Sequence, residues 1–69
     1  MPGDIGLVAA LLTRVFGFVV DKDGYAALTR ERQLKFLMRA INDATEEGDW
    51  ATVDALFAEY RLLKQQTGS

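Results

Sequence analysis

The sequence predicts an all-α protein: an antiparallel helical hairpin plus an apolar N-terminal helix, associating as a homodimer. Two runs of apolar residues repeat at helical spacing, and Gly48-Asp49 separates them with almost no loop. A hydrophobic content of 49% is ample for a folded core and argues against disorder. We expect one small helical domain, residues 1–69, with helices at about 4–19, 25–47 and 50–66.

The composition limits how so short a chain is stabilised. A chain of 69 residues buries only about 60% of the surface that its unfolded form exposes. The absence of cysteine and histidine excludes disulfides, thiolate metal sites and imidazole chemistry. Oligomerisation is the remaining common source of stability, which is why a homodimer is predicted. A net charge of −2 gives no general attraction to nucleic acid or anionic membrane, and the lack of cysteine fits a cytoplasmic location.

The first predicted helix, at about 4–19, begins at a capping residue and is almost wholly apolar. The Asp4 carboxylate is suited to accept from the free N–H groups of the first turn. Val15–Val20 is β-branched and aromatic, so an irregular end is expected near Gly17. Apolar residues recur at helical spacing at Ile5, Val8, Leu12, Val15 and Val19.

The same apolar segment, 5–20, raises the question of membrane contact. Its 16 positions include Arg14, whereas a spanning helix needs roughly 20 apolar residues. A secretory signal carries basic residues before the apolar run, and the early charge here is Asp4. We therefore expect this helix to pack against the hairpin or a second copy, with membrane-surface association as the alternative.

The second predicted helix, at about 25–47, follows a turn at 21–24. Either Asp23 caps a helix that starts directly, or Thr29 caps a helix that begins at Arg30. Its apolar stripe consists of Leu34, Leu37, Met38, Ile41 and Ala44. The opposite, solvated side consists of Arg32, Lys35, Arg39, Asp43 and Glu46.

Phe36 does not fit this division, because helical spacing places it among the basic residues of the solvated side. It is covered by the first helix, covered by a second subunit, or left for a partner. Aromatic and arginine side chains are enriched in binding hot spots, so the third alternative is carried forward.

The third predicted helix, at about 50–66, starts at the junction. Gly48 suits the left-handed position after a helix, and Asp49 suits the N-cap of the next one. The apolar residues of this helix are Trp50, Val53, Leu56, Phe57, Tyr60 and Leu63. They cover a wider arc than one hairpin seam needs, so we expect packing on two surfaces: the second helix, and either the first helix or another subunit.

Charge is distributed unevenly along the hairpin, with a basic end and an acidic end. Three alternatives account for this pattern. The charges cluster by chance on a solvated surface, an antiparallel homodimer places basic ends near acidic ends, or the basic end meets an acidic partner. The candidate partner-binding residues are Arg32, Lys35, Phe36, Arg39, Arg61 and Lys64. The candidate dimer or core residues are Val8, Leu12, Val15, Phe16, Val19, Trp50, Phe57 and Tyr60.

Several functions are disfavoured by the residues available. Catalysis lacks a nucleophile with a positioned base, since the only serine is Ser69. A calcium loop around 21–24 would place Val19 and Arg30 at ligand positions, and neither is a useful calcium ligand. The carboxylates near Gly48 are explained as helix-end and cap residues. We therefore expect no metal and no cofactor. Direct DNA binding is not expected, because the helix after the acidic junction opens without arginines to contact bases.

Two resemblances bear on function. The stretch from Ala40 to Phe57, with Gly48-Asp49-Trp50 at its centre, looks like one helix junction of a tetratricopeptide repeat, but there is no second copy. The short chain with an apolar N-terminal segment, the turn 20–25 and the charged hairpin 30–63 resembles the small accessory proteins of temperate transposable phages, in particular the phage anti-activators that inhibit quorum sensing. That resemblance implies a helical homodimer in the host bacterial cytoplasm. It also implies binding to a LuxR-type transcription regulator and to the type IV pilus assembly ATPase.

We therefore expect a non-enzymatic protein that acts by stoichiometric binding. Its mechanism would be occlusion, in which an aromatic and basic surface covers a partner's functional face. The alternatives are a membrane-associated protein that uses segment 5–20, and a structural subunit of a larger assembly.

Overall fold

A computed structural model describes residues 4–67, without the side chain of residue 67, and in this range the chain is helical with no strand. The all-α prediction is confirmed. The helices are α1 (Ile5–Phe16), α2 (Lys22–Ala27), α3 (Arg30–Glu47) and α4 (Trp50–Thr67). Ser69 lies outside the described residues.

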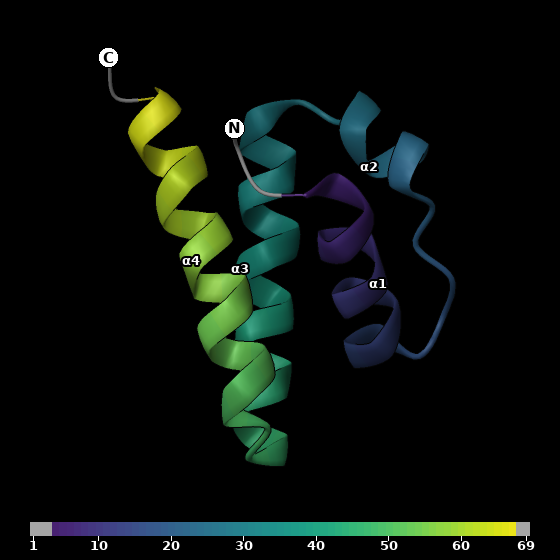
Figure 1. The fold of residues 1–69 in the computed structure, drawn as a ribbon, viewed down its shortest axis with the longest axis vertical. Coiled ribbons are helices and arrows are strands. Elements are labelled where there is room, and N and C mark those ends of the chain that lie inside the picture. The colour runs from purple at the N-terminus through teal and green to yellow at the C-terminus, as the bar shows by residue number, and fades with distance from the viewer. Residues whose placement is uncertain (1–3, 68–69) are drawn as a thin grey trace.

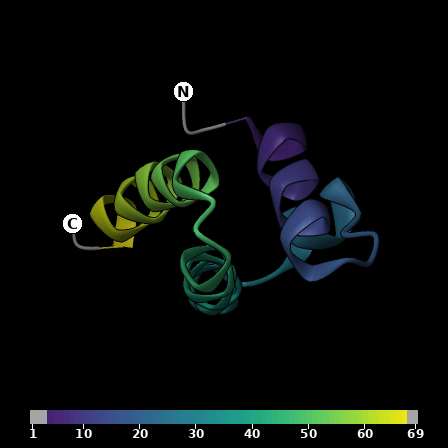
Figure 2. The same ribbon diagram turned by 90° about the horizontal axis from the view of Figure 1, so that it is seen from below.

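The long helix α3 is the centre of the molecule. It runs antiparallel to α4 along one flank, while α1 and the short α2 lie along the other (Figure 1). Seen from below, α3 is almost end-on between these two groups (Figure 2). Helix α1 also contacts α4, so the three longer helices enclose one core.

Side-chain caps fix where the helices begin, as the sequence predicts. The amide of Gly6 donates to Asp4 Oδ1 at 2.9 Å, and the amide of Arg32 donates to Thr29 Oγ1 at 3.2 Å. Each bond satisfies an amide that has no partner within its own helix.

The junction between α3 and α4 is a Schellman motif. Gly48 has φ +75°, the left-handed conformation that costs glycine little. Its amide donates to the carbonyl of Thr45, and the amide of Asp49 donates to the carbonyl of Ala44. Asp49 then caps α4 through the amide and hydroxyl of Thr52, with the hydroxyl at 2.7 Å. Two residues thus end one helix and start the next.

The first helix is shorter than predicted, which is the main correction to its bounds. It ends at Phe16, not near Val19, because Gly17 adopts φ +79° and donates its amide to the carbonyl of Thr13 at 2.9 Å. The chain then turns away, and Val19 becomes 83% exposed. Gly17 and the β-branched and aromatic residues of 15–20 therefore end the helix, although apolar residues continue at helical spacing as far as Val19.

The single helix predicted at 25–47 is also wrong, since two helices occupy this range. Asp21, not Asp23, caps α2, and its Oδ2 accepts the amide of Gly24 at 3.0 Å. Leu28 and Thr29 are extended, with ψ of 150° and 156°, which separates α2 from α3. The alternative in which Thr29 caps a helix that begins at Arg30 is confirmed.

The core lies between α1, α3 and α4, with one residue from α2. Its buried members are Val8, Leu12, Tyr25, Leu37, Ala40, Ile41, Leu56 and Leu63. Met38 was expected in the apolar stripe of α3 but is exposed, because it lies at the edge of the arc that α1 and α4 cover. Gln33 is buried instead, and its Nε2 donates to the carbonyl of Tyr25 at 2.9 Å, which fastens α2 to α3.

Candidate functional site

The loop between α1 and α2 is held in one conformation by a single side chain. Thr13 Oγ1 accepts the amide of Val20 at 2.8 Å and donates to the carbonyl of Val20 at 3.4 Å. Together with the left-handed turn at Gly17, this clamp fixes both ends of the segment 17–20 against α1. The intervening side chains of Phe18 and Val19 are therefore displayed on an anchored loop.

Three phenylalanines join this loop to α3. The rings of Phe16 and Phe18 are stacked, with centroids 5.5 Å apart and planes 9° apart. The ring of Phe36 meets that of Phe16 edge-on, at 6.0 Å and 62°. Such pairs contribute about 0.5–1.5 kcal/mol beyond their buried area. Phe36 is thus partly covered by α1, which is one of the alternatives that the sequence left open.

Two hollows flank this aromatic cluster, and both are lined by Phe18 and Phe36. The first has a volume of about 240 Å³ and is lined by Phe18, Val19, Val20, Asp21, Gly24, Tyr25, Leu28 and Phe36. The second has a volume of about 390 Å³ and is lined by Val15, Phe16, Phe18, Phe36, Arg39 and Asp43. We call the two hollows together the aromatic groove.

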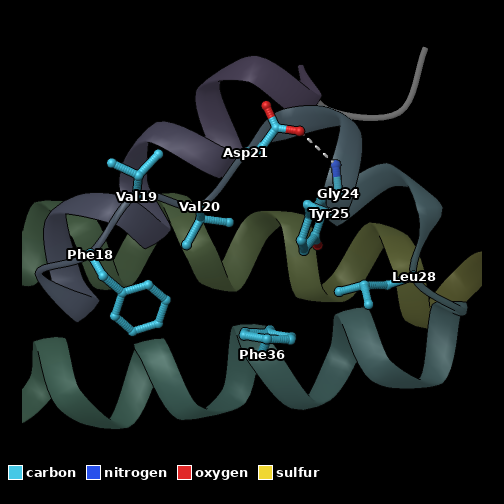
Figure 3. A pocket seen from close by; sticks show the side chains of 8 residues that line it. All are labelled: Phe18, Val19, Val20, Asp21, Gly24, Tyr25, Leu28 and Phe36. Carbon is cyan, nitrogen blue, oxygen red and sulfur yellow. Dashed lines mark hydrogen bonds between the residues drawn. The ribbon is translucent and has the colours of Figure 1, made fainter.

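Figure 3 shows how the first hollow is built. Phe18 points from the loop toward α3, and Phe36 lies opposite on α3, with Leu28 closing one end. The carboxylate of Asp21 is turned toward the amide of Gly24, so it serves as a helix cap and leaves the lining largely apolar. A concave apolar site with charges at its edge is the usual form of a binding site.

Charge at the groove comes mainly from one face of α3. Arg32 and Arg39 lie four residues before and three after Phe36, so they share its face of the helix, and Arg39 lines the second hollow. Arg32, Lys35 and Arg39 are exposed and form no ion pair with the described residues. One carboxylate, Asp43, faces the same hollow as Arg39. The charged residues that line the two hollows are thus Asp21, Arg39 and Asp43, and Arg32 and Lys35 add positive charge on α3 nearby.

The predicted partner-binding set divides between two parts of the molecule. Phe36 and Arg39 line the groove, and Arg32 and Lys35 lie near it on α3. Arg61 and Lys64 are exposed on α4, and no residue of α4 lines either hollow. The structure therefore does not bring these two residues to the same site as Phe36.

The predicted dimer or core set also divides. Val8 and Leu12 are buried in the core, whereas Val15 and Phe16 are half-buried and line the groove. Val19 is exposed at the groove. The remaining three members are on α4: Trp50 is 62% exposed, Phe57 is 45% exposed, and half-buried Tyr60 meets Phe57 edge-on with centroids 6.1 Å apart.

Sequence reasoning missed several groove residues, namely Phe18, Val20, Tyr25 and Leu28. The signal for Phe18 was Gly17, because a glycine that ends a helix turns the following aromatic residue off the helical face. Nothing local signals Tyr25, whose burial depends on helices that come later in the chain.

Three titratable groups have shifted pKa values: Asp49 and Glu59, which lie outside the groove, and Tyr25, which lines its first hollow. The hydrogen bond from the Thr52 hydroxyl lowers the pKa of Asp49, and Arg14 at 3.9 Å acts in the same direction. Burial raises the pKa of Glu59. Burial, reinforced by the Glu59 carboxylate, raises the pKa of Tyr25, whose hydroxyl has no hydrogen-bond partner among the described residues. Asp49 and Glu59 line neither hollow, whereas the buried Tyr25 forms part of the inner wall of the first one.

Comparison with known proteins returns no match to a family model, a curated protein or a solved structure. Within residues 4–67 no helix is long and apolar enough to cross a membrane. The acidic side chains of that range form no cluster of three that could hold a metal ion. The groove is therefore interpreted from its own chemistry.

Proposed function

We propose that this protein is a small, non-enzymatic binding module whose aromatic groove captures an amphipathic helix of a partner protein. The observation that carries the proposal is the anchored display of Phe18 and Val19, which are 58% and 83% exposed. Large apolar side chains that stay mostly in water beside a hollow are typical of interaction sites.

The rim specifies the partner's chemistry. Arg32, Lys35 and Arg39 present positive charge beside the apolar lining, so the complementary helix carries carboxylates next to its apolar stripe. Helix-in-groove recognition uses anchors spaced three, four and seven residues apart, and two adjacent hollows suit two successive anchors. Phe18 and Phe36 line both hollows, so each touches both anchors.

The biological role that fits this chemistry is inhibition by occlusion. The resemblance to phage anti-activators implies two partners for this chain: a LuxR-type quorum-sensing regulator and the type IV pilus assembly ATPase. The protein would act in the cytoplasm of the bacterial host. Binding would cover a face that the partner needs for its own activity, with no chemical step by this chain.

The test is titration calorimetry with a purified LuxR-type regulator. Phe18→Ala should weaken binding at least tenfold, because it removes an exposed ring without disturbing the buried core. Leu7→Ala is the matched control, since Leu7 is also 58% exposed but lies on α1 outside both hollows. Arg39→Glu should weaken binding most at low salt, as expected for a rim charge.

Equal losses from Phe18→Ala and Leu7→Ala would refute the groove as the binding site. Absence of binding to both the regulator and the pilus ATPase would refute these partners. Flotation of the protein with anionic vesicles, lost in Phe18→Ala, would replace the protein partner by a membrane surface. Thermal unfolding by circular dichroism checks that each variant remains folded.

A further inference from the structure

Helix α4 presents a second apolar arc that the protomer leaves open. Its core arc contains Leu56 and Leu63, which are buried against the other helices. About a third of a turn away, Trp50 and Phe57 are exposed, and the half-buried Val53 and Tyr60 lie between them and the core. This explains the wide apolar arc of the sequence: one part is used within the protomer and the other is not.

The open arc has the spacing of a coiled-coil seam. Trp50, Val53, Phe57 and Tyr60 are separated by three, four and three residues, which are the a and d positions of two successive heptads. The e positions beside them are occupied by Asp54 and Arg61, which are exposed and unpaired among the described residues. One flank of the seam therefore carries a negative charge and, seven residues later, a positive charge.

We infer that this arc, called here the α4 seam, is the interface of a homodimer in which α4 packs antiparallel against α4 of a second copy. In an antiparallel pair the e positions of the two helices face each other. A two-fold axis between Phe57 and Tyr60 then places Asp54 of each copy opposite Arg61 of the other. The charges are complementary to a second copy of this chain, which is why this occupant is chosen.

The available area fits a modest affinity. A fully covered tryptophan or phenylalanine buries about 150–250 Å², so the exposed parts of Trp50 and Phe57 in two copies amount to roughly 500 Å². A specific interface needs about 1,000 Å² in total, and Val53, Tyr60 and the charged flanks supply the remainder. The dimer is therefore expected to form in the micromolar range and not at nanomolar concentration.

The dimer goes beyond the proposed function and is independent of it. Both hollows of the aromatic groove are lined by residues from α1, α2, α3 and the loop, and none from α4. Pairing through α4 thus leaves two grooves open on one dimer. Phe18→Ala should weaken partner binding and leave the dimer intact, so the failure of one proposal does not imply the failure of the other.

The decisive experiment uses charge reversal measured by sedimentation equilibrium from micromolar to millimolar concentration. Asp54→Arg and Arg61→Asp should each weaken dimerisation about tenfold, because each places like charges opposite one another twice. The double variant D54R/R61D should recover the dimer, since the exchanged charges pair again. An equimolar mixture of the two single variants should also dimerise, as a heterodimer.

This design separates pairing between copies from effects within one helix. Residues seven apart lie two turns from each other and do not interact within α4, so recovery in the double variant or in the mixture requires a second copy. Phe57→Ser should abolish the dimer, while Leu7→Ser, on an exposed part of α1, should leave it unchanged. A monomer at all concentrations, or a dimer indifferent to Phe57→Ser and to charge reversal, would overturn the inference.

Discussion

Replacing Thr13 by valine tests whether one hydroxyl holds the groove loop in place. Valine keeps the shape of threonine and removes Oγ1, which accepts the Val20 amide at 2.8 Å and donates to the Val20 carbonyl at 3.4 Å. A typical hydrogen bond contributes about 1 kcal/mol, and a buried amide left without a partner costs about 1–3 kcal/mol. Val20 is half-buried, so water reaches part of this site and the lower end applies.

We therefore expect Thr13→Val to lower the free energy of unfolding by about 1–2 kcal/mol. For a domain of this size, that loss lowers the Tm by roughly 5–12 °C. The Val20 amide should exchange with solvent faster than in the parent protein, because its acceptor is gone. Partner binding at the groove should weaken as well, because Phe18 is no longer held over the two hollows.

Thr45→Val is the matched control. Thr45 Oγ1 donates to the Ile41 carbonyl at 2.7 Å within α3, and Thr45 is exposed. That carbonyl keeps its helical partner, so the control should change stability by no more than about 0.5 kcal/mol. Urea unfolding and amide hydrogen exchange measure both variants. Equal losses in the two variants, with unchanged exchange at Val20, would refute the clamp.

Two further predictions concern the helix junction and the core. Gly48→Ala should lower the free energy of unfolding by about 1 kcal/mol, because alanine is strained at φ +75°. Gly24→Ala, within α2, should raise the free energy of unfolding by up to about 1 kcal/mol. Thermal unfolding in which both variants shift the Tm in the same direction would contradict these two expectations. Glu59 has a raised pKa in the fold, so its contribution to stability is fully present below its ordinary pKa of 4.5 and is lost as pH rises through the folded-state value. Glu59→Gln should remove this loss, so its free energy of unfolding, measured against pH, should exceed that of the parent at pH 7 but not at low pH. The exposed Glu46→Gln controls for the loss of one surface charge.

The sequence predicted the starts of α1 and α4 and the α3–α4 junction, and it offered the start of α3 as one of two alternatives, because these features depend on neighbours within a few residues. A carboxylate or hydroxyl at Asp4, Thr29 or Asp49 caps the amides two or three positions later, wherever the rest of the chain lies. Gly48 ends α3 for an equally local reason. The failures at Val19 and at the break before Thr29 were also local, since Gly17 and the competing caps were visible but were outweighed by apolar spacing.

The candidate site was predicted only in part. Spacing identified Phe36 as an aromatic among basic residues, and the structure places it in the groove beside Arg39. The sequence did not associate Phe36 with Phe18 or Tyr25, because they meet only when α1 and α2 fold back along α3. The amphipathic pattern states which face of a helix is apolar, but not which other element covers it.

The sequence by itself determined the all-helical class, the caps of α1 and α4, the turn at Gly48 and the two-sided apolar character of α4, because propensity, capping and periodicity act within one segment. The tertiary structure alone decided which apolar side chains are covered. Helix α3 has two flanks, and α4 took one while α1 and α2 took the other, so Tyr25 and Glu59 were buried and Phe18 and Trp50 were left in water. Burial is a property of the packed arrangement of helices, and no single segment of the chain contains that information.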